Sequence, residues 1–82
     1  MTLQQAAIGH SAQVRMNLHL NGHVYPIAQM GGGRMIFDKP VMLPSGTGMV
    51  VMQVDGLEQR WRVAVPAQAC PQRTVMASFG PV

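Results

Sequence analysis

The sequence predicts an all-β domain, folded as a five-stranded antiparallel β-barrel or a strongly curved sheet. One observation is the nearly uninterrupted succession of strand and turn signals from residue 14 to residue 65, with apolar and polar residues alternating clearly over residues 14–21, which is typical of strands with one solvated face. The other is a pair of dipeptides, Asn21-Gly22 and Asp55-Gly56, which favour two-residue type I′ turns because both central residues need a positive φ. Strands are predicted over residues 13–20, 23–30, 34–38, 48–54 and 57–65.

The first predicted hairpin shows the alternation most clearly. Apolar residues take every second position before its turn, namely Val14, Met16, Leu18 and Leu20. A two-residue loop sets Leu18 opposite Tyr25 and Met16 opposite Ile27, and residues directly opposite each other share a face. Pro26 in the second strand has no N–H to donate, which predicts an edge strand or a bulge there.

The second predicted hairpin places Val50 opposite Trp61 on its apolar face. The other face carries Met49, Val51, Gln53, Glu58, Arg60 and Arg62. Between the two hairpins, the Gly31-Gly32-Gly33 corner leads into the strand over residues 34–38, which Lys39-Pro40 is expected to end.

The two ends of the chain differ in kind. Thr2 and Gln5 have the spacing of a capping box, so residues 3–8 form either a short helix or a frayed terminus. The core of a single domain, residues 1–82, is expected over residues 13–66, followed by an irregular, proline-containing tail over residues 67–82. Three apolar residues of that tail are expected to dock on the body or on a partner: Val75, Met76 and Phe79.

Composition points to an apolar contact surface. Hydrophobic residues make up 48% of the chain and charged residues only 11%, whereas a typical domain has about 25% charged residues. Met49 and Val51 are apolar on a face expected to meet water, so either a helix or the tail covers that face or a second chain does. The second alternative predicts a protein interface at these two residues. The partner would be a second copy in a homo-oligomer or another protein.

The sequence predicts a protein without enzymatic activity. His19 and His23 have a metal-like spacing, but the intervening turn places them on opposite faces of the hairpin, which argues against a shared zinc. No local Ser/His/Asp or Cys/His set is present, and Cys70 is the single cysteine. No catalytic residue, metal or cofactor is therefore predicted. With no signal peptide and no apolar run of about 20 residues, the chain is expected to be cytoplasmic and not to bind membranes.

A second set of residues predicts a ligand site instead. The net charge is +3, and Arg60 and Arg62 share one strand face. The glycine corner exposes backbone N–H groups that can bind anions, and Arg34 directly after Gly33 adds charge. These residues would bind a nucleotide or a nucleic acid. The alternatives are that the arginines only keep one face soluble and that the glycines only form a flexible or bulged corner between two strands.

The chain resembles the PilZ family over roughly residues 28–65. The similarity lies in three stretches, Gly32-Gly33-Arg34-Met35-Ile36-Phe37, Leu43-Pro44-Ser45-Gly46-Thr47 and the strands 50–54 and 60–65. The resemblance implies a small β-barrel of a family in which many members bind cyclic di-GMP. Only Gly33 matches the ligand motif, since Ala28 and Met30 stand at its polar positions and His19 replaces the second arginine of Arg-x-x-x-Arg. It therefore implies a degenerate member that has lost the nucleotide.

Two functions follow from these observations. The first is a non-enzymatic interaction module that self-associates or docks a protein partner through apolar faces. The second is a β-barrel that binds a cyclic dinucleotide-like ligand or a nucleic acid through Arg60, Arg62 and the glycine corner.

Overall fold

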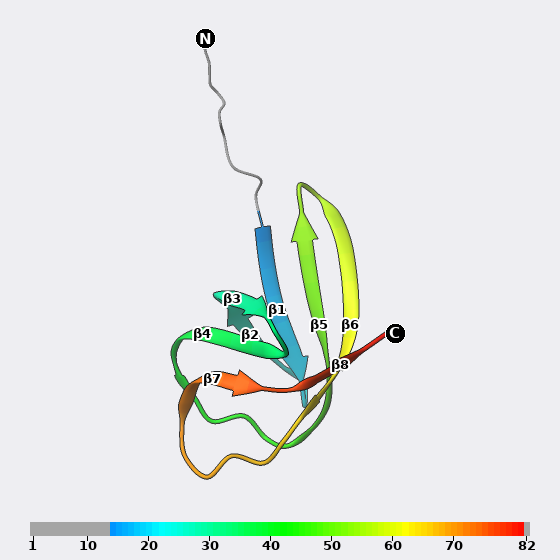
Figure 1. Cartoon of the computed structure of the whole chain (residues 1–82). Coiled ribbons are helices and arrows are strands. Elements are labelled where there is room, and N and C mark those ends of the chain that lie inside the picture. The colour runs from blue at the N-terminus through cyan, green and yellow to red at the C-terminus, as the bar shows by residue number, and fades with distance from the viewer. Residues whose placement is uncertain (1–13, 82) are drawn as a thin grey trace.

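The computed structural model describes residues 14–81, which form eight strands and no helix. The strands are β1 Val14–Leu20, β2 His23–Ile27, β3 Gln29–Gly31, β4 Arg34–Val41, β5 Gly46–Val54, β6 Leu57–Val65, β7 Gln72–Met76 and β8 Ser78–Gly80. They make two antiparallel sheets, one of five strands in the order β2-β1-β5-β6-β8 and one of three in the order β3-β4-β7 (Figure 1).

The all-β, antiparallel prediction is confirmed, but the barrel is not. Within residues 14–81 no strand of one sheet is hydrogen-bonded to a strand of the other, so the two sheets remain separate instead of closing into a barrel. The predicted helix over residues 3–8 lies outside the described residues.

Both predicted hairpin registers are confirmed. Leu18 lies opposite Tyr25 in the first hairpin, and Val50 lies opposite Trp61 in the second. The turn residues Asn21 and Asp55 have positive φ angles of 54° and 51°. The strand that contains Pro26 is an edge strand, as expected, because β2 ends the order of the five-stranded sheet.

The predicted strand over residues 23–30 is two strands. The chain leaves β1 after Ile27, and the N–H of Ala28 donates to the carbonyl of Ile36, 2.8 Å away. Residues 29–31 then pair with β4 in the other sheet. Residues 23–30 contain no Gly, Asn, Asp or Ser that would mark a break. Their hydrogen-bonding partner nevertheless changes, and the local sequence does not carry that information.

The strand predicted over residues 34–38 continues to Val41. Its pairing with β7 is irregular between Ile36 and Val41, and Pro40, which lacks an N–H, falls within that interval. Arg73 on β7 donates its Nε to the carbonyl of Phe37 at 3.3 Å. A bulge therefore accommodates the proline without ending the strand.

The segment predicted to be an irregular tail contains β7 and β8, one in each sheet. Val75 on β7 is only 1% exposed, and the N–H of Ala77 donates to the carbonyl of Gly33 at 3.0 Å. Gln68 holds the preceding loop, since its Oε1 accepts from the N–H of Leu43 at 2.7 Å and its Nε2 donates to the carbonyl of Val41 at 3.0 Å. These contacts make the C-terminal strands part of the core.

The core lies between the two sheets. Its buried side chains come from both of them and from one loop: Leu18, Leu20, Ile27, Met35, Phe37, Leu43, Val50, Val63, Val65 and Val75. We call the face of the five-stranded sheet that carries Leu18, Val50 and Val63 the inner face. The opposite face is the outer face, because side chains alternate along each strand.

One part of the five-stranded sheet extends beyond the core. Figure 1 shows the β5–β6 hairpin and the first residues of β1 projecting away from the three-stranded sheet. We call residues 14–16 and 51–61 the arm. Two apolar residues of its inner face are largely exposed, with Leu57 at 75% and Val14 at 50%, because the three-stranded sheet does not cover the arm.

Candidate interaction site

The outer edge of β6 is partly unpaired. On one side β6 pairs with β5 along its whole length, but on the other side β8 pairs only with residues 62–64. Strand β8 ends at Gly80, and residue 81 is not paired with β6. Residues 57–61 therefore present a free strand edge of five residues among the residues that the structure describes.

The register determines which backbone groups point to that edge. In a two-residue hairpin, the residues flanking the turn exchange hydrogen bonds, and bonded and non-bonded pairs then alternate. Val54 and Leu57 flank the turn here. The N–H and C=O groups of Glu58 and Arg60 therefore point away from β5, toward the free edge.

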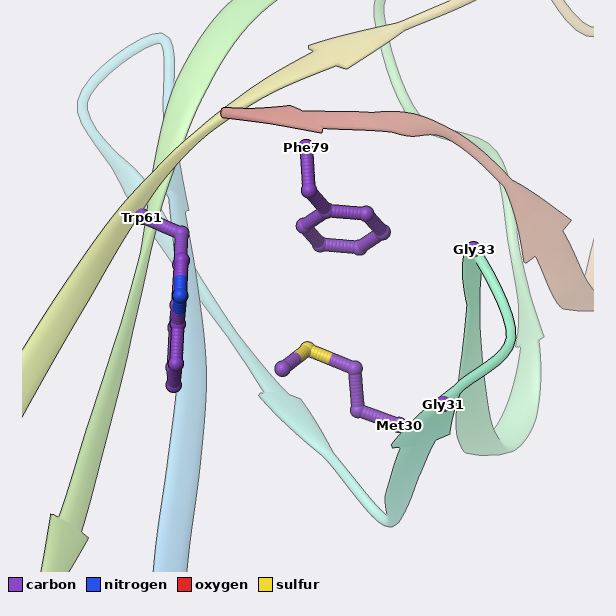
Figure 2. Close-up of a pocket in the computed structure, with 5 residues that line it drawn as sticks. All are labelled: Met30, Gly31, Gly33, Trp61 and Phe79. Atoms are coloured by element: carbon purple, nitrogen blue, oxygen red, sulfur yellow. The ribbon is translucent and has the colours of Figure 1, made fainter. Parts of the chain in front are cut away.

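An apolar pocket adjoins the free edge. Five residues line it: Met30, Gly31, Gly33, Trp61 and Phe79. Figure 2 shows Trp61 and Phe79 forming two sides of an open space, with the Met30 side chain across from them. The cavity has a volume of about 120 Å³. Among the described residues that line it, the indole nitrogen of Trp61 is the only polar side-chain atom.

Tight turns bring these five residues together. Gly32 and Gly33 have positive φ angles of 61° and 74° and form a two-residue turn, since Gly31 pairs with Arg34. The predicted glycine corner is thus the turn of a third hairpin. Its carbonyl at Gly33 accepts the Ala77 N–H, which holds the start of β8, and hence Phe79, near the corner.

The outer face combines the predicted interface with the predicted basic pair. Met49 lies opposite Arg62, and Val51 lies opposite Arg60. Both apolar residues are half-buried, although no described strand covers the outer face. Arg60 forms an ion pair with Glu58 on the same strand. His19 and His23 project to opposite faces, because His19 lies opposite Val24 and not opposite His23.

The residues predicted to bind a ligand do not form one site. Arg60 and Arg62 extend from the outer face, whereas Gly33 lines the pocket on the side of Trp61, a residue of the inner face. Arg34 belongs to the three-stranded sheet, where it pairs with Met76. Its guanidinium lies over its own turn, with Nη2 3.7 Å from where a Cβ on Gly32 would be.

Sequence reasoning missed three residues of the site, namely Met30, Leu57 and Phe79. The two-residue period of the strand assigns Leu57 and Trp61 to the same apolar face. That period predicts which face a side chain lies on, but not whether another part of the fold covers it. Phe79 lay in a segment assigned as irregular. No signal within the sequence pairs Phe79 with Met30, because they belong to different sheets.

No family model matches this chain, and no curated protein or solved structure matches it significantly. The resemblance to PilZ domains therefore stays a prediction. Over residues 14–81, no cluster of three or more His, Cys, Asp or Glu residues could hold a metal ion. The same residues include no helix long and apolar enough to cross a membrane.

Proposed function

We propose that this chain is a non-enzymatic, cytoplasmic interaction module that binds another protein chain as an added strand along residues 57–61. The observation that carries the proposal is a free strand edge next to an open apolar pocket. An added strand gains backbone hydrogen bonds from the edge, and pockets for alternate side chains supply specificity. Here Glu58 and Arg60 offer the backbone groups, and Trp61 with Phe79 offers the pocket.

The composition of the arm supports the same function. Exposed strand edges are usually shortened, covered or given charges that prevent unwanted pairing. Only Glu58 and Arg60 are charged within the free edge, and their opposite charges pair with each other. The edge therefore keeps little net repulsion toward a second strand.

The test is selection of short extended peptides from a display library on the immobilised protein. Selected peptides should carry an apolar side chain for the pocket and should shift the backbone amide NMR signals of Glu58 and Arg60. Arg60→Pro removes one outward N–H at an edge position that tolerates proline, so it should weaken binding by about tenfold or more. Arg60→Ala, which keeps the N–H, should bind within about threefold of the wild type.

Peptides that bind equally well to both Arg60 variants would refute strand addition. Shifts confined to the outer face would do the same. Thermal unfolding of Arg60→Pro should resemble that of Arg60→Ala, because the lost N–H pairs with no strand among residues 14–81.

A second function, nucleic-acid binding, is supported by the charge of the outer face. Arg15, Arg60 and Arg62 extend from it, with Glu58 as the acid of the same face. Binding through phosphates should weaken steeply with added salt and should be lost in Arg60→Ala with Arg62→Ala. Single-stranded and double-stranded oligonucleotides in a fluorescence anisotropy titration would test it. A cyclic dinucleotide has less support, because Gly33 and the two arginines lie on opposite faces.

A further inference from the structure

We infer that the chain that adds to β6 is a second copy of the same protein, paired antiparallel about a two-fold axis at Gln59. This inference rests on the proposed function and names its partner. The free edge reads Leu57-Glu58-Gln59-Arg60-Trp61. Paired with itself about its central residue, it sets Glu58 opposite Arg60 of the partner subunit and Leu57 opposite Trp61 of the partner subunit.

The backbone geometry allows this register. Glu58 and Arg60 both direct their N–H and C=O groups outward, and in this register they face each other. Each such pair exchanges two hydrogen bonds, and the axis generates it twice. Gln59 then faces its own copy in a non-bonded pair, as the alternation requires.

Charge distinguishes this register from its neighbours. Centring the axis on Arg60 places that residue opposite its own copy and Glu58 opposite Arg62, where β8 already pairs. Centring it on Glu58 places two carboxylates opposite each other and Arg60 opposite Gly56, in the turn. Opposite charges directly across a strand pair stabilise it, and like charges destabilise it. The Gln59 register alone puts an acid opposite a base at both outward pairs.

The length of the free edge matches the same arrangement. The partner strand can extend only to Trp61, since β8 occupies the edge from Arg62 onward. In the Gln59 register the partner's Leu57 reaches that limit, and its Asp55-Gly56 turn follows directly. The five residues left free by β8 are therefore the five that β6 can contribute before its own turn.

The pocket has a natural occupant in this dimer. The partner's Leu57 would lie beside Trp61, on the same side of β6 as Phe79, and both lining residues bound the pocket (Figure 2). An apolar cavity of about 150 Å³ can accept a benzene-sized group, so a volume of about 120 Å³ suits one aliphatic side chain. Leu57, 75% exposed in the single chain, would lose most of its contact with water, and each copy would complete the other's pocket.

The first test is native mass by light scattering coupled to size exclusion, between about 1 µM and about 500 µM, because small interfaces give weak dimers. The wild type should form a dimer. Glu58→Arg should raise the Kd by about tenfold to a hundredfold, because it places like charges opposite each other twice. Combining it with Arg60→Glu exchanges the charges and should restore the Kd to within about threefold.

The second test fixes the register by crosslinking, in a Cys70→Ser background. Gln59→Cys should give a disulfide-linked dimer on mild oxidation, since non-bonded antiparallel partners lie about 4.5 Å apart at Cα. Leu57→Cys is the matched control on the same face and arm. Its two copies would be offset by four residues, about 13 Å, which is beyond the reach of a disulfide.

A monomer throughout the concentration range would overturn the inference. So would a dimer that resists Glu58→Arg but dissociates in Met49→Glu with Val51→Glu, which would assign the contact to the outer face. Crosslinking by Leu57→Cys and not by Gln59→Cys would also overturn it. If the wild type is monomeric while selected peptides still bind in a manner sensitive to Arg60→Pro, the added-strand function stands and only its partner is wrong.

Discussion

Gly48→Ala should destabilise the fold, because strand β1 passes too close to Gly48 to allow a Cβ. A Cβ built there would lie 2.6 Å from the backbone carbonyl oxygen of His19 and 3.1 Å from Cδ1 of Leu20. To reach the 3.4 Å at which ordinary contact begins, the Cβ and the carbonyl would have to separate by about 0.8 Å. Since the nearer atom belongs to the backbone, the end of β1 has to move with it.

The expected size of the effect follows from two opposing terms. Forcing an extra methyl into a packed site costs about 1–3 kcal/mol. Replacing glycine with alanine also lowers the conformational entropy of the unfolded chain, which stabilises the folded state by about 0.4–1 kcal/mol. The net loss in the free energy of unfolding should be about 1–2 kcal/mol, which lowers Tm by roughly 5–15 °C in a domain of this size.

Circular dichroism during heating and urea titration would measure this loss. The matched control is Gly31→Ala, also in a strand, where a Cβ meets nothing within 4 Å and φ is not positive. That variant should be as stable as the wild type or more stable, by about 0.5 kcal/mol. A Tm for Gly48→Ala equal to that of the wild type, or an equal fall in both variants, would refute the steric argument.

Three further substitutions test other parts of the fold by the same unfolding measurements. Val75→Ala should lower the free energy of unfolding by about 2 kcal/mol, because it removes buried apolar surface and leaves a cavity. The control is Met76→Ala: Met76 is 59% exposed, so its replacement should change the free energy of unfolding by less than about 0.5 kcal/mol. Equal effects would mean that β7 is not part of the core. Gln68→Glu removes the donor to the Val41 carbonyl and should lower the free energy of unfolding by about 1–3 kcal/mol. The control Gln72→Glu, exposed on β7, should leave it nearly unchanged. A Gln68→Glu variant as stable as the wild type would show that this side chain does not anchor the loop. Asn21→Ala should lower the free energy of unfolding by about 1 kcal/mol, because φ is positive at this position. Asn21→Gly should cause no such loss. Equal destabilisation by both substitutions would contradict the turn assignment.

The two hairpins could be predicted from sequence because their information is local. Asn21-Gly22 and Asp55-Gly56 define both turn and register within a few residues, and burial follows from the alternation. Leu18 and Val50 are therefore buried where the pattern predicts them.

The remaining strands depend on partners far along the chain. β7 pairs with β4, and β8 pairs with β6, and neither pairing leaves a periodic signal in so short a segment. The break at Ala28 has the same origin, because the choice between β1 and β4 as a partner is a tertiary one.

The candidate site shows the same division. Trp61 was assigned correctly to the apolar face of its hairpin, and Arg60 to the opposite face. The pocket also requires Phe79 from the C-terminal segment and Met30 from the other sheet, so its existence depends on tertiary packing. The exposure of Leu57 likewise follows from where the three-stranded sheet ends.

The chain passes from one sheet to the other at Ala77, and this affects how it can fold during synthesis. One residue separates β7, which completes the three-stranded sheet, from β8, which joins the other sheet. While the ribosome still holds residues 72–80, both sheets lack an edge strand and the core lacks Val75. The nascent chain can form its local hairpins early, but we expect it to fold completely only after this segment has left the exit tunnel. Until then the unpaired sheet edges are prone to aggregation, which chaperones would limit.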